Sequence, residues 1–222
     1  AIRFCLERTD IFLTQLRAIL RSSELGNVKM MYPLISSKQE FCQANEILQI
    51  ARQELEEQKK GFNPSMEVGA MIEVPSAAIT ANHIAEEADF FSIGTNDLIQ
   101  YALAVDRVNE KIAYLYDPAH PAILRLISEI IQAGHNHGIE VGLCGEMGGD
   151  VTLIPLLLGM GIDEISMNAT AIPVVKKMIR SIGRQECENF AREMLKLSSG
   201  EQIWEHSRQV VLAKAPELLE LG

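Results

Sequence analysis

Apolar and polar residues follow two different patterns along this chain. Short, nearly continuous apolar runs occur at five places, and the stretches between them carry apolar residues at helical spacing. The runs predict five β-strands, at residues 28–35, 67–75, 90–94, 139–147 and 164–168. Because the runs do not alternate with polar residues, we expect a parallel sheet buried on both faces, as in α/β proteins.

The intervening stretches predict helices with recognisable ends. One helix is expected from Thr9-Asp10 to the serines of ILRSS, with Gly26 after its end, and a long one from Ser36-Ser37 to the charged EEQKKG. Another begins at Asn96-Asp97. Further helices are expected at residues 76–88, at residues 121–137 with Gly138 as the stop, from Asp150 through LIPLLLGMG, and after residue 168 as far as Ala215.

Strand–helix alternation over 222 residues fits an α/β fold, and a single α/β barrel has about this length. In such folds the functional residues lie where strands end and helices begin. The residues at the five predicted strand ends are Pro33, Glu73, Asn96-Asp97, Cys144 with Glu146, and Met167-Asn168.

Composition narrows the classes of partner. The net charge of −10 argues against nucleic acid or an anionic membrane as a general partner. No apolar run approaches the length of about 18 residues that a spanning helix needs, and the first residues do not resemble a secretory signal. The four cysteines form no CxxC pair, which favours a reducing, cytoplasmic location. The chain begins at Ala1, which is expected of a processed chain or a fragment.

Two carboxylates stand at neighbouring strand ends. Glu73 lies in the apolar MIEVP, where a carboxylate needs a partner, and Asp97 follows the next strand. Glu73 could accept a backbone hydrogen bond or meet an arginine. Alternatively, Glu73 and Asp97 together could hold Mg²⁺, which prefers oxygen ligands and keeps several waters. Cysteine and histidine do not occur at the spacing of a zinc site.

The GTND turn and Arg107 each allow two interpretations. Asn96 and Asp97 could cap the helix that they begin, or the turn could present free N–H groups to an anion. Arg107 lies past the end of that helix, since ten helical residues span about 15 Å. Its planar guanidinium suits a phosphate or carboxylate, although a cation there could also stabilise the helix end. The spacing does not separate these interpretations.

Cys144 stands before Gly145 at a strand end. Burial in the core is the common role of such a cysteine, but the adjacent glycine permits a close approach and the thiol could transfer a proton. Taken together, the strand ends predict a site for an anionic, phosphorylated small molecule with Mg²⁺ and a possible proton donor.

Three segments carry a family resemblance. DFFSIGTNDLIQYALAVDR, at residues 89–107, resembles the second signature of the phosphoenolpyruvate (PEP)-utilising enzymes, and GAMIEVPSA and GLCGEMGGD resemble the family's flanking strand motifs. The family includes enzyme I of the sugar phosphotransferase system, pyruvate phosphate dikinase and phosphoenolpyruvate synthase. The stretch TNDLIQYALAVDRVN looks most like enzyme I, whereas the dikinase and the synthase differ around residues 101–105.

The resemblance implies a fold and a set of roles. Residues 1–222 would form a single PEP-binding domain, part of a (β/α)₈ TIM-type barrel with about five of its eight strands. Glu73 and Asp97 would hold Mg²⁺, while Asn96, Asp97 and Arg107 would bind the substrate. Cys144 would protonate C3 of the enolate that remains after the phosphoryl group leaves.

The same resemblance implies partners. The phosphoryl group would pass to a histidine on a separate N-terminal domain and then to a small histidine phosphocarrier protein, and the domain would form a homodimer. The family's first three barrel strands, its upstream phosphate-clamping arginines and its histidine acceptor motif are not in this sequence. We therefore expect a fragment with an open sheet edge that transfers phosphate poorly by itself. Dikinase, synthase and a binding-only module are the alternatives.

Overall fold

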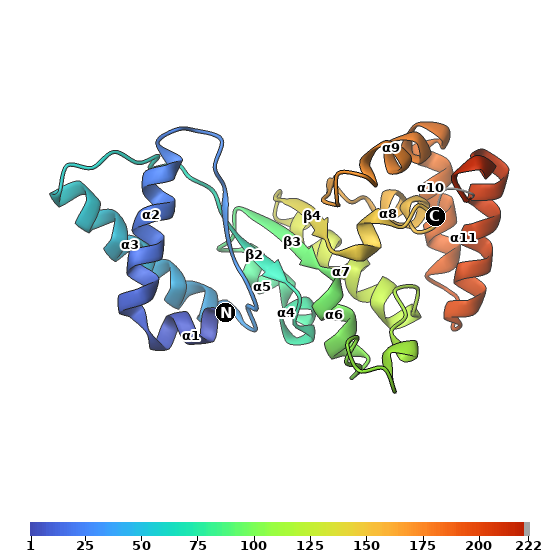
Figure 1. Cartoon of the computed structure of the whole chain (residues 1–222), viewed down its shortest axis with the longest axis horizontal. Helices are drawn as coiled ribbons and strands as arrows, with labels where there is room; N and C mark the ends of the chain where they lie inside the picture. The colour runs from blue at the N-terminus through green and yellow to red at the C-terminus, as the bar shows by residue number, and fades with distance from the viewer. Residues whose placement is uncertain (220–222) are drawn as a thin grey trace.

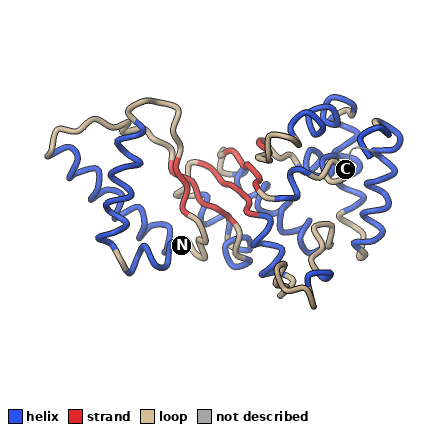
Figure 2. Tube along the Cα trace, in the orientation of Figure 1, coloured by secondary structure: helices blue, strands red, loops and turns tan. Residues whose placement is uncertain are grey.

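A computed structural model describes residues 1–219, so the domain end predicted at residue 222 lies outside the described part. A five-stranded sheet occupies the middle of the molecule (Figures 1 and 2). Its strands are β1 (Met30–Tyr32), β2 (Val68–Ile72), β3 (Phe90–Gly94), β4 (Glu140–Cys144) and β5 (Glu164–Ile165). They are all parallel and lie in the order of the sequence. The predicted α/β class and the five strands are confirmed.

The helices, in chain order, are α1 (Ile2–Glu7), α2 (Thr9–Ser23), α3 (Lys38–Glu57), α4 (Pro75–Ile79), α5 (Ala81–Ala85), α6 (Thr95–Ala102), α7 (Pro121–Asn136), α8 (Ile154–Met160), α9 (Ile172–Ser181), α10 (Arg184–Met194) and α11 (Gly200–Lys214). Three short 3₁₀ helices are η1 (Ala113–Leu115), η2 (Glu146–Gly149) and η3 (Pro216–Leu219). In Figure 1, α1–α3 lie at one end of the molecule and α9–α11 at the other.

Sequential strand order is the order of a barrel, whereas doubly wound sheets reverse direction at a switch point. The sequential strand order also places the connecting helices on one face of the sheet. Side chains on that face, such as Tyr32, Ile72 and Ile93, are buried. The opposite face is open in the described chain, where Met31 is 39% exposed. The expectation of burial on both faces is therefore wrong for this chain, because described helices cover one face only.

The helix ends differ in part from expectation. Ser37 caps α3 by accepting a hydrogen bond from the N–H of Glu40, as predicted. Thr9-Asp10 does not cap a helix, since α2 already begins at Thr9 and has no side-chain cap. Asp150 does not cap α8, which begins at Ile154. Its carboxylate instead accepts from the N–H of Thr152 in the preceding turn.

The helix predicted at residues 76–88 is broken in two. Thr80 separates α4 from α5, and its hydroxyl donates to the carbonyl oxygen of Ser76 at 2.8 Å. Such a back-bond to the preceding turn competes with the helical pattern and bends the chain. The predicted strands were also too long, because at most five residues of each apolar run pair with a neighbouring strand.

The C-terminal helices pack closely through a glycine. Gly159 of α8 faces the backbone of α10, and a Cβ at this position would meet the carbonyl oxygen of Cys187. A backbone atom cannot swing aside as a flexible side chain can. The contact between these helices therefore requires glycine at position 159.

We predict that Gly159→Ala lowers the free energy of unfolding by about 1–3 kcal/mol, because overpacking outweighs the higher helix propensity of alanine. Urea unfolding would measure the change. Gly183→Ala is the control for a methyl group added without overpacking, since no atom lies within 4 Å of a Cβ built there; because Gly183 is the N-cap of α10, this variant should lose less than about 1 kcal/mol. Equal stability of the two variants would contradict this packing argument.

Candidate active site

The strand register brings the predicted site residues to one edge of the sheet. Ile72 pairs with Ile93, and Gly94 pairs with Cys144. Glu73 directly follows β2, and Cys144 is the last residue of β4. Asn96 and Asp97 stand between them, in the first turn of α6. Four of the five predicted residues thus converge at the carboxyl ends of three adjacent strands.

Glu73 is held in a narrow recess. It is only 5% exposed, and its Oε1 accepts a hydrogen bond of 2.7 Å from the N–H of Leu34. Leu34 has a φ of 55°, a left-handed conformation that is uncommon for a bulky residue. A Cβ at Gly94 would lie 2.6 Å from Oε2, so glycine is required beside this carboxylate. The hydrogen bond from a backbone N–H to Glu73, one of the two interactions expected from the sequence, is therefore present.

The two carboxylates oppose each other electrostatically. Burial, together with the nearby Asp97, raises the pKa of Glu73 to about 7, against the lowering effect of the hydrogen bond from the Leu34 N–H. Among residues 1–219, no lysine, arginine or histidine forms an ion pair with either carboxylate. The arginine partner that the sequence allowed for Glu73 is therefore not found in the described chain.

The Glu73–Asp97 pair is suited to Mg²⁺, and does not form a metal site in which protein side chains supply all the ligands. No group of three or more histidine, cysteine, aspartate or glutamate side chains that could hold a metal occurs in the described residues. Two carboxylates alone leave most of an octahedral shell to water and to a ligand's own oxygens, which is the usual coordination of Mg²⁺. A cation at Glu73 and Asp97 would also offset the repulsion that raises the pKa of Glu73.

Asn96 is oriented by two donors. Its Oδ1 accepts from the N–H of Glu146 at 3.1 Å and from the hydroxyl of Tyr116 at 3.4 Å. Neither Asn96 nor Asp97 caps α6, whose N-cap is Gly94 without a side-chain hydrogen bond. The capping interpretation is wrong because the helix begins one residue earlier than the pattern indicated.

Gly145 packs against the α6 turn. Its φ is 110°, and a Cβ there would meet Thr95 Oγ1 and lie 3.0 Å from Asn96 Oδ1. The Thr95 hydroxyl donates to the carbonyl oxygen of Cys144 at 2.9 Å. The glycine next to Cys144 therefore serves the contact between the β4 loop and α6, whereas the sequence had suggested room for a ligand.

Cys144 is only half-buried, unlike an ordinary core cysteine. The hydroxyl of Ser92 lies 3.6 Å from its Sγ, on the open face of the sheet. Both residues line a small cavity of about 140 Å³ together with Met31 and Phe90. The thiol is thus accessible from the side of the sheet that described helices do not cover.

Arg107 lies beyond the end of α6 and turns back toward the site. Its Nη1 is 3.4 Å from Oε1 of Glu146, in the loop after β4. Both side chains are solvent-exposed, Glu146 at 78%, so this ion pair is weak and an incoming anion can displace it. The guanidinium therefore faces the same strand-end region as Asn96.

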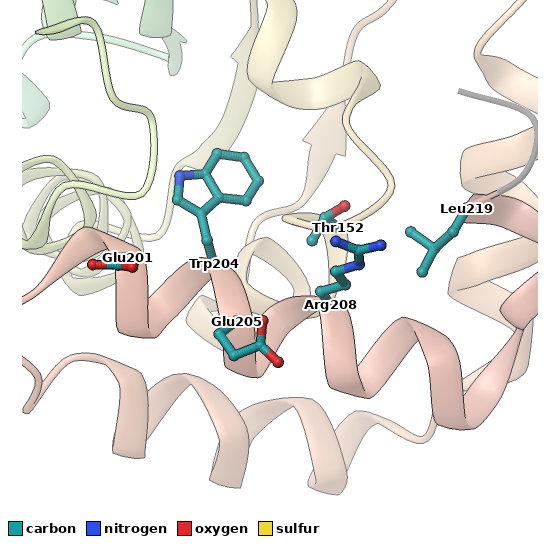
Figure 3. A pocket seen from close by; sticks show the side chains of 6 residues that line it. All are labelled: Thr152, Glu201, Trp204, Glu205, Arg208 and Leu219. Atoms are coloured by element: carbon teal, nitrogen blue, oxygen red, sulfur yellow. The ribbon is translucent and has the colours of Figure 1, made fainter. Parts of the chain in front are cut away.

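Two larger cavities lie beside this region and contain none of the predicted site residues. One of about 520 Å³ is lined by residues of α11 and its surroundings (Figure 3), and Arg208 and Trp204 project from the same helix there. It shares Thr152 and Leu219 with a cavity of about 650 Å³ that extends to Glu146.

Sequence reasoning missed several supporting groups. The N–H of Leu34 holds Glu73, Tyr116 and Glu146 hold Asn96, and Glu146 also meets Arg107. Glu146 was noted at a strand end but given no role. Tyr116 stands in a charged, proline-containing loop whose spacing gives no sign that it folds back onto α6.

The raised pKa of Glu73 predicts a pH dependence of stability. Since the folded-state pKa of about 7 exceeds the ordinary 4.5, the folded state binds the proton more tightly. The free energy of unfolding should therefore fall as pH rises from about 4.5 to 7, by on the order of 1–3 kcal/mol. Glu73→Gln should remove this loss, and Mg²⁺ should reverse it in the unchanged chain only.

Urea unfolding at several pH values, with and without Mg²⁺, measures this effect. Glu129→Gln is the control, because Glu129 is exposed on α7 and far from the carboxylate pair in the sequence. Parallel pH profiles for the unchanged chain and Glu73→Gln would show that Glu73 is not the titrating group.

Comparison with known proteins places the chain in a family. The family model described as PEP-utilising enzyme, PEP-binding domain, matches residues 1–184. Phosphoenolpyruvate-protein phosphotransferase of Bacillus subtilis (strain 168) is 50% identical over 203 residues, covering 91% of this chain and 36% of that protein. The protein of the same name from Priestia megaterium is 50% identical over 205 residues, covering 92% and 36%.

A solved structure of the protein CitE from Mycobacterium tuberculosis, in complex with magnesium and pyruvate, shows a distant likeness. It has 17% sequence identity and a TM-score of 0.45, and the match covers 77% of this chain and 66% of that one. Likeness at this level supports no conclusion about fold or ligand. The chain spans about a third of the length of its phosphotransferase relatives. On the family match and these identities, the chain belongs to the phosphoenolpyruvate-utilising enzymes.

Proposed function

We propose that this chain is the PEP-binding and phosphotransfer domain of a phosphoenolpyruvate-protein phosphotransferase, the enzyme I of a sugar phosphotransferase system. The observation that carries the proposal is the carboxylate pair of buried Glu73 and partly buried Asp97, next to Asn96 and Cys144 at one sheet edge. The names of relatives about 50% identical favour this function over a dikinase or a synthase. Residues 1–222 would act as a single domain.

Glu73 and Asp97 would hold Mg²⁺, which when bound neutralises negative charge on the ligand's oxygens. The amide of Asn96 and the guanidinium of Arg107 would bind the phosphate or carboxylate of PEP. The first N–H groups of α6, next to Asn96, add donors and a favourable dipole for the same anion. The ligand would displace Glu146 from Arg107.

In the proposed reaction the bond between phosphorus and the enol oxygen breaks, and the phosphoryl group passes to a histidine nitrogen. The electron pair stays on the enol oxygen, which leaves the enolate of pyruvate. Cys144 would then give its Sγ proton to C3, forming pyruvate, and its thiolate would recover a proton from water. A thiol suits this step because it is a much stronger acid than a serine hydroxyl.

The proposed partners follow from the relatives. The accepting histidine would stand on a separate domain, and a small histidine phosphocarrier would receive the phosphoryl group next. We further propose a homodimer in a reducing cytoplasm, where the four free cysteines would remain thiols. Within residues 1–219, no helix has the length and apolar character needed to cross a bilayer.

The first test concerns Mg²⁺. We predict that PEP binds to this chain more tightly with Mg²⁺ than without it, and that Glu73→Gln and Asp97→Asn each remove the metal dependence. Each loses one anionic oxygen ligand and leaves the side-chain volume nearly unchanged. Isothermal calorimetry gives the affinities, with Glu129→Gln as the exposed control. Metal-dependent binding that survives in both variants would contradict the assignment.

A second test isolates the proton transfer. With Mg²⁺ in D₂O, the chain should exchange the methyl protons of pyruvate for deuterium, which NMR detects without any phosphohistidine domain. Cys144→Ser should slow this exchange about 10²-fold or more, because a serine hydroxyl is a far weaker acid, while pyruvate affinity changes little. Normal exchange in Cys144→Ser would make the thiol a packing residue and assign the proton to another group.

A further inference from the structure

The loop between α6 and α7, residues 103–120, is attached to two separate parts of the molecule. The hydroxyl of Tyr116 reaches Asn96 of α6, at the proposed substrate site. The next residue, Asp117, accepts a hydrogen bond of 2.9 Å from the indole Nε1–H of Trp204 in α11. The two adjacent residues therefore join the C-terminal helix to the α6 turn.

The contacts of Asn96 determine which end of its amide faces a ligand. The backbone N–H of Glu146 can only donate, so the Asn96 atom 3.1 Å from it must be the carbonyl oxygen Oδ1. The hydroxyl of Tyr116 donates to the same oxygen. With Oδ1 occupied by two donors, the NH₂ group of Asn96 remains for an acceptor, as a phosphate or carboxylate oxygen would be.

Asp117 is fixed firmly on the α11 side. Its Oδ1 also accepts from the N–H of Ala119 at 2.9 Å, which closes the turn around the carboxylate. A Cβ at Gly200 would meet Asp117 Oδ2, so glycine is needed where α11 begins. Figure 3 shows the indole of Trp204 projecting from α11. This helix lies beyond residues 1–184, the part that the family model matches.

We propose that Tyr116 and Trp204 are positioning residues for the substrate site: Trp204 anchors Asp117, and the adjacent Tyr116 holds the Asn96 amide with its NH₂ group toward the bound anion. The inference rests on the proposed function, because it assigns a purpose to Asn96 in PEP binding. On this proposal, α11 influences the affinity for PEP although it supplies no ligand-binding residue itself.

The chemistry of Tyr116 supports this role. Burial raises its pKa to about 12, and the carboxylate of Glu146 acts in the same direction, so the hydroxyl keeps its proton at neutral pH and can donate. Tyr114, two residues earlier, is 80% exposed and makes no side-chain hydrogen bond in the described chain. The same loop thus offers a matched tyrosine that should have no effect on ligand binding.

Calorimetric titration of this chain with PEP and Mg²⁺ tests the proposal. Tyr116→Phe keeps its ring and loses only the hydroxyl donor, whereas Trp204→Phe loses the Nε1–H donor and exchanges the indole for a smaller phenyl ring. Each should weaken PEP binding about 3- to 10-fold. Tyr114→Phe should bind like the unchanged chain. Melting temperatures recorded alongside show whether each variant is folded.

A double-mutant cycle separates positioning from a general structural effect. If Tyr116 acts through Asn96, then Tyr116→Phe should change affinity little once Asn96→Ala is present. Trp204 is the single tryptophan of the chain, so its fluorescence should change when PEP binds, and less so in Tyr116→Phe.

The outcomes are distinguishable. Normal affinity of both Tyr116→Phe and Trp204→Phe, or equal losses with and without Asn96, would overturn the positioning roles and leave the proposed function intact. If the unchanged chain binds no PEP with Mg²⁺, the proposed function fails and the inference fails with it.

Discussion

Burial of Glu73 is the constraint on which the rest of the site depends. A carboxylate that is 5% exposed must have partners, and here they are the N–H of Leu34, the space left by Gly94, and the neighbouring Asp97. The first two are built into the backbones of adjacent strand ends, one of them at an uncommon positive φ. The third is repulsive, so a bound cation would stabilise the arrangement. Burial of a carboxylate without a cationic partner among the described residues is expected where binding, and not folding stability, has determined the residue.

Two glycines transmit this constraint along the sheet edge. Gly94 makes room for Glu73, and Gly145 makes room for Thr95 and Asn96. The ends of β2, β3 and β4 therefore pack directly against one another. A side chain at either glycine would separate two strand ends that meet at the proposed ligand site. The motifs that carry the family resemblance therefore contain packing requirements as well as the residues proposed to bind the ligand.

Much of this could be predicted from sequence, for a physical reason. Strand cores and strand ends are local features: apolar runs revealed β2, β3 and β4, and the polar residues after them are the ones that converge. What could not be predicted depends on contacts over long sequence distances. The pairs Leu34–Glu73, Tyr116–Asn96 and Arg107–Glu146 join segments 20 to 39 residues apart. Likewise, an apolar run in the sequence does not show whether one or both faces of the sheet are covered. Met31 and Phe90 are apolar but lie on the face that described helices leave open.

The hydrogen bond that attaches α11 to the loop before α7 links sequence changes in α11 to the proposed ligand site. Residues that bind the ligand are restricted by chemistry, but the hydrogen bond between Trp204 and Asp117 acts on Asn96 only through the intervening loop. If Trp204 and Tyr116 have the proposed positioning roles, changes in α11 adjust how firmly the Asn96 amide is held without altering any proposed ligand-binding group. An ordered loop lowers the entropy lost on binding, whereas a looser one would weaken affinity and speed release. On the proposed roles, affinity would be tuned from a helix outside residues 1–184, the part that the family model matches.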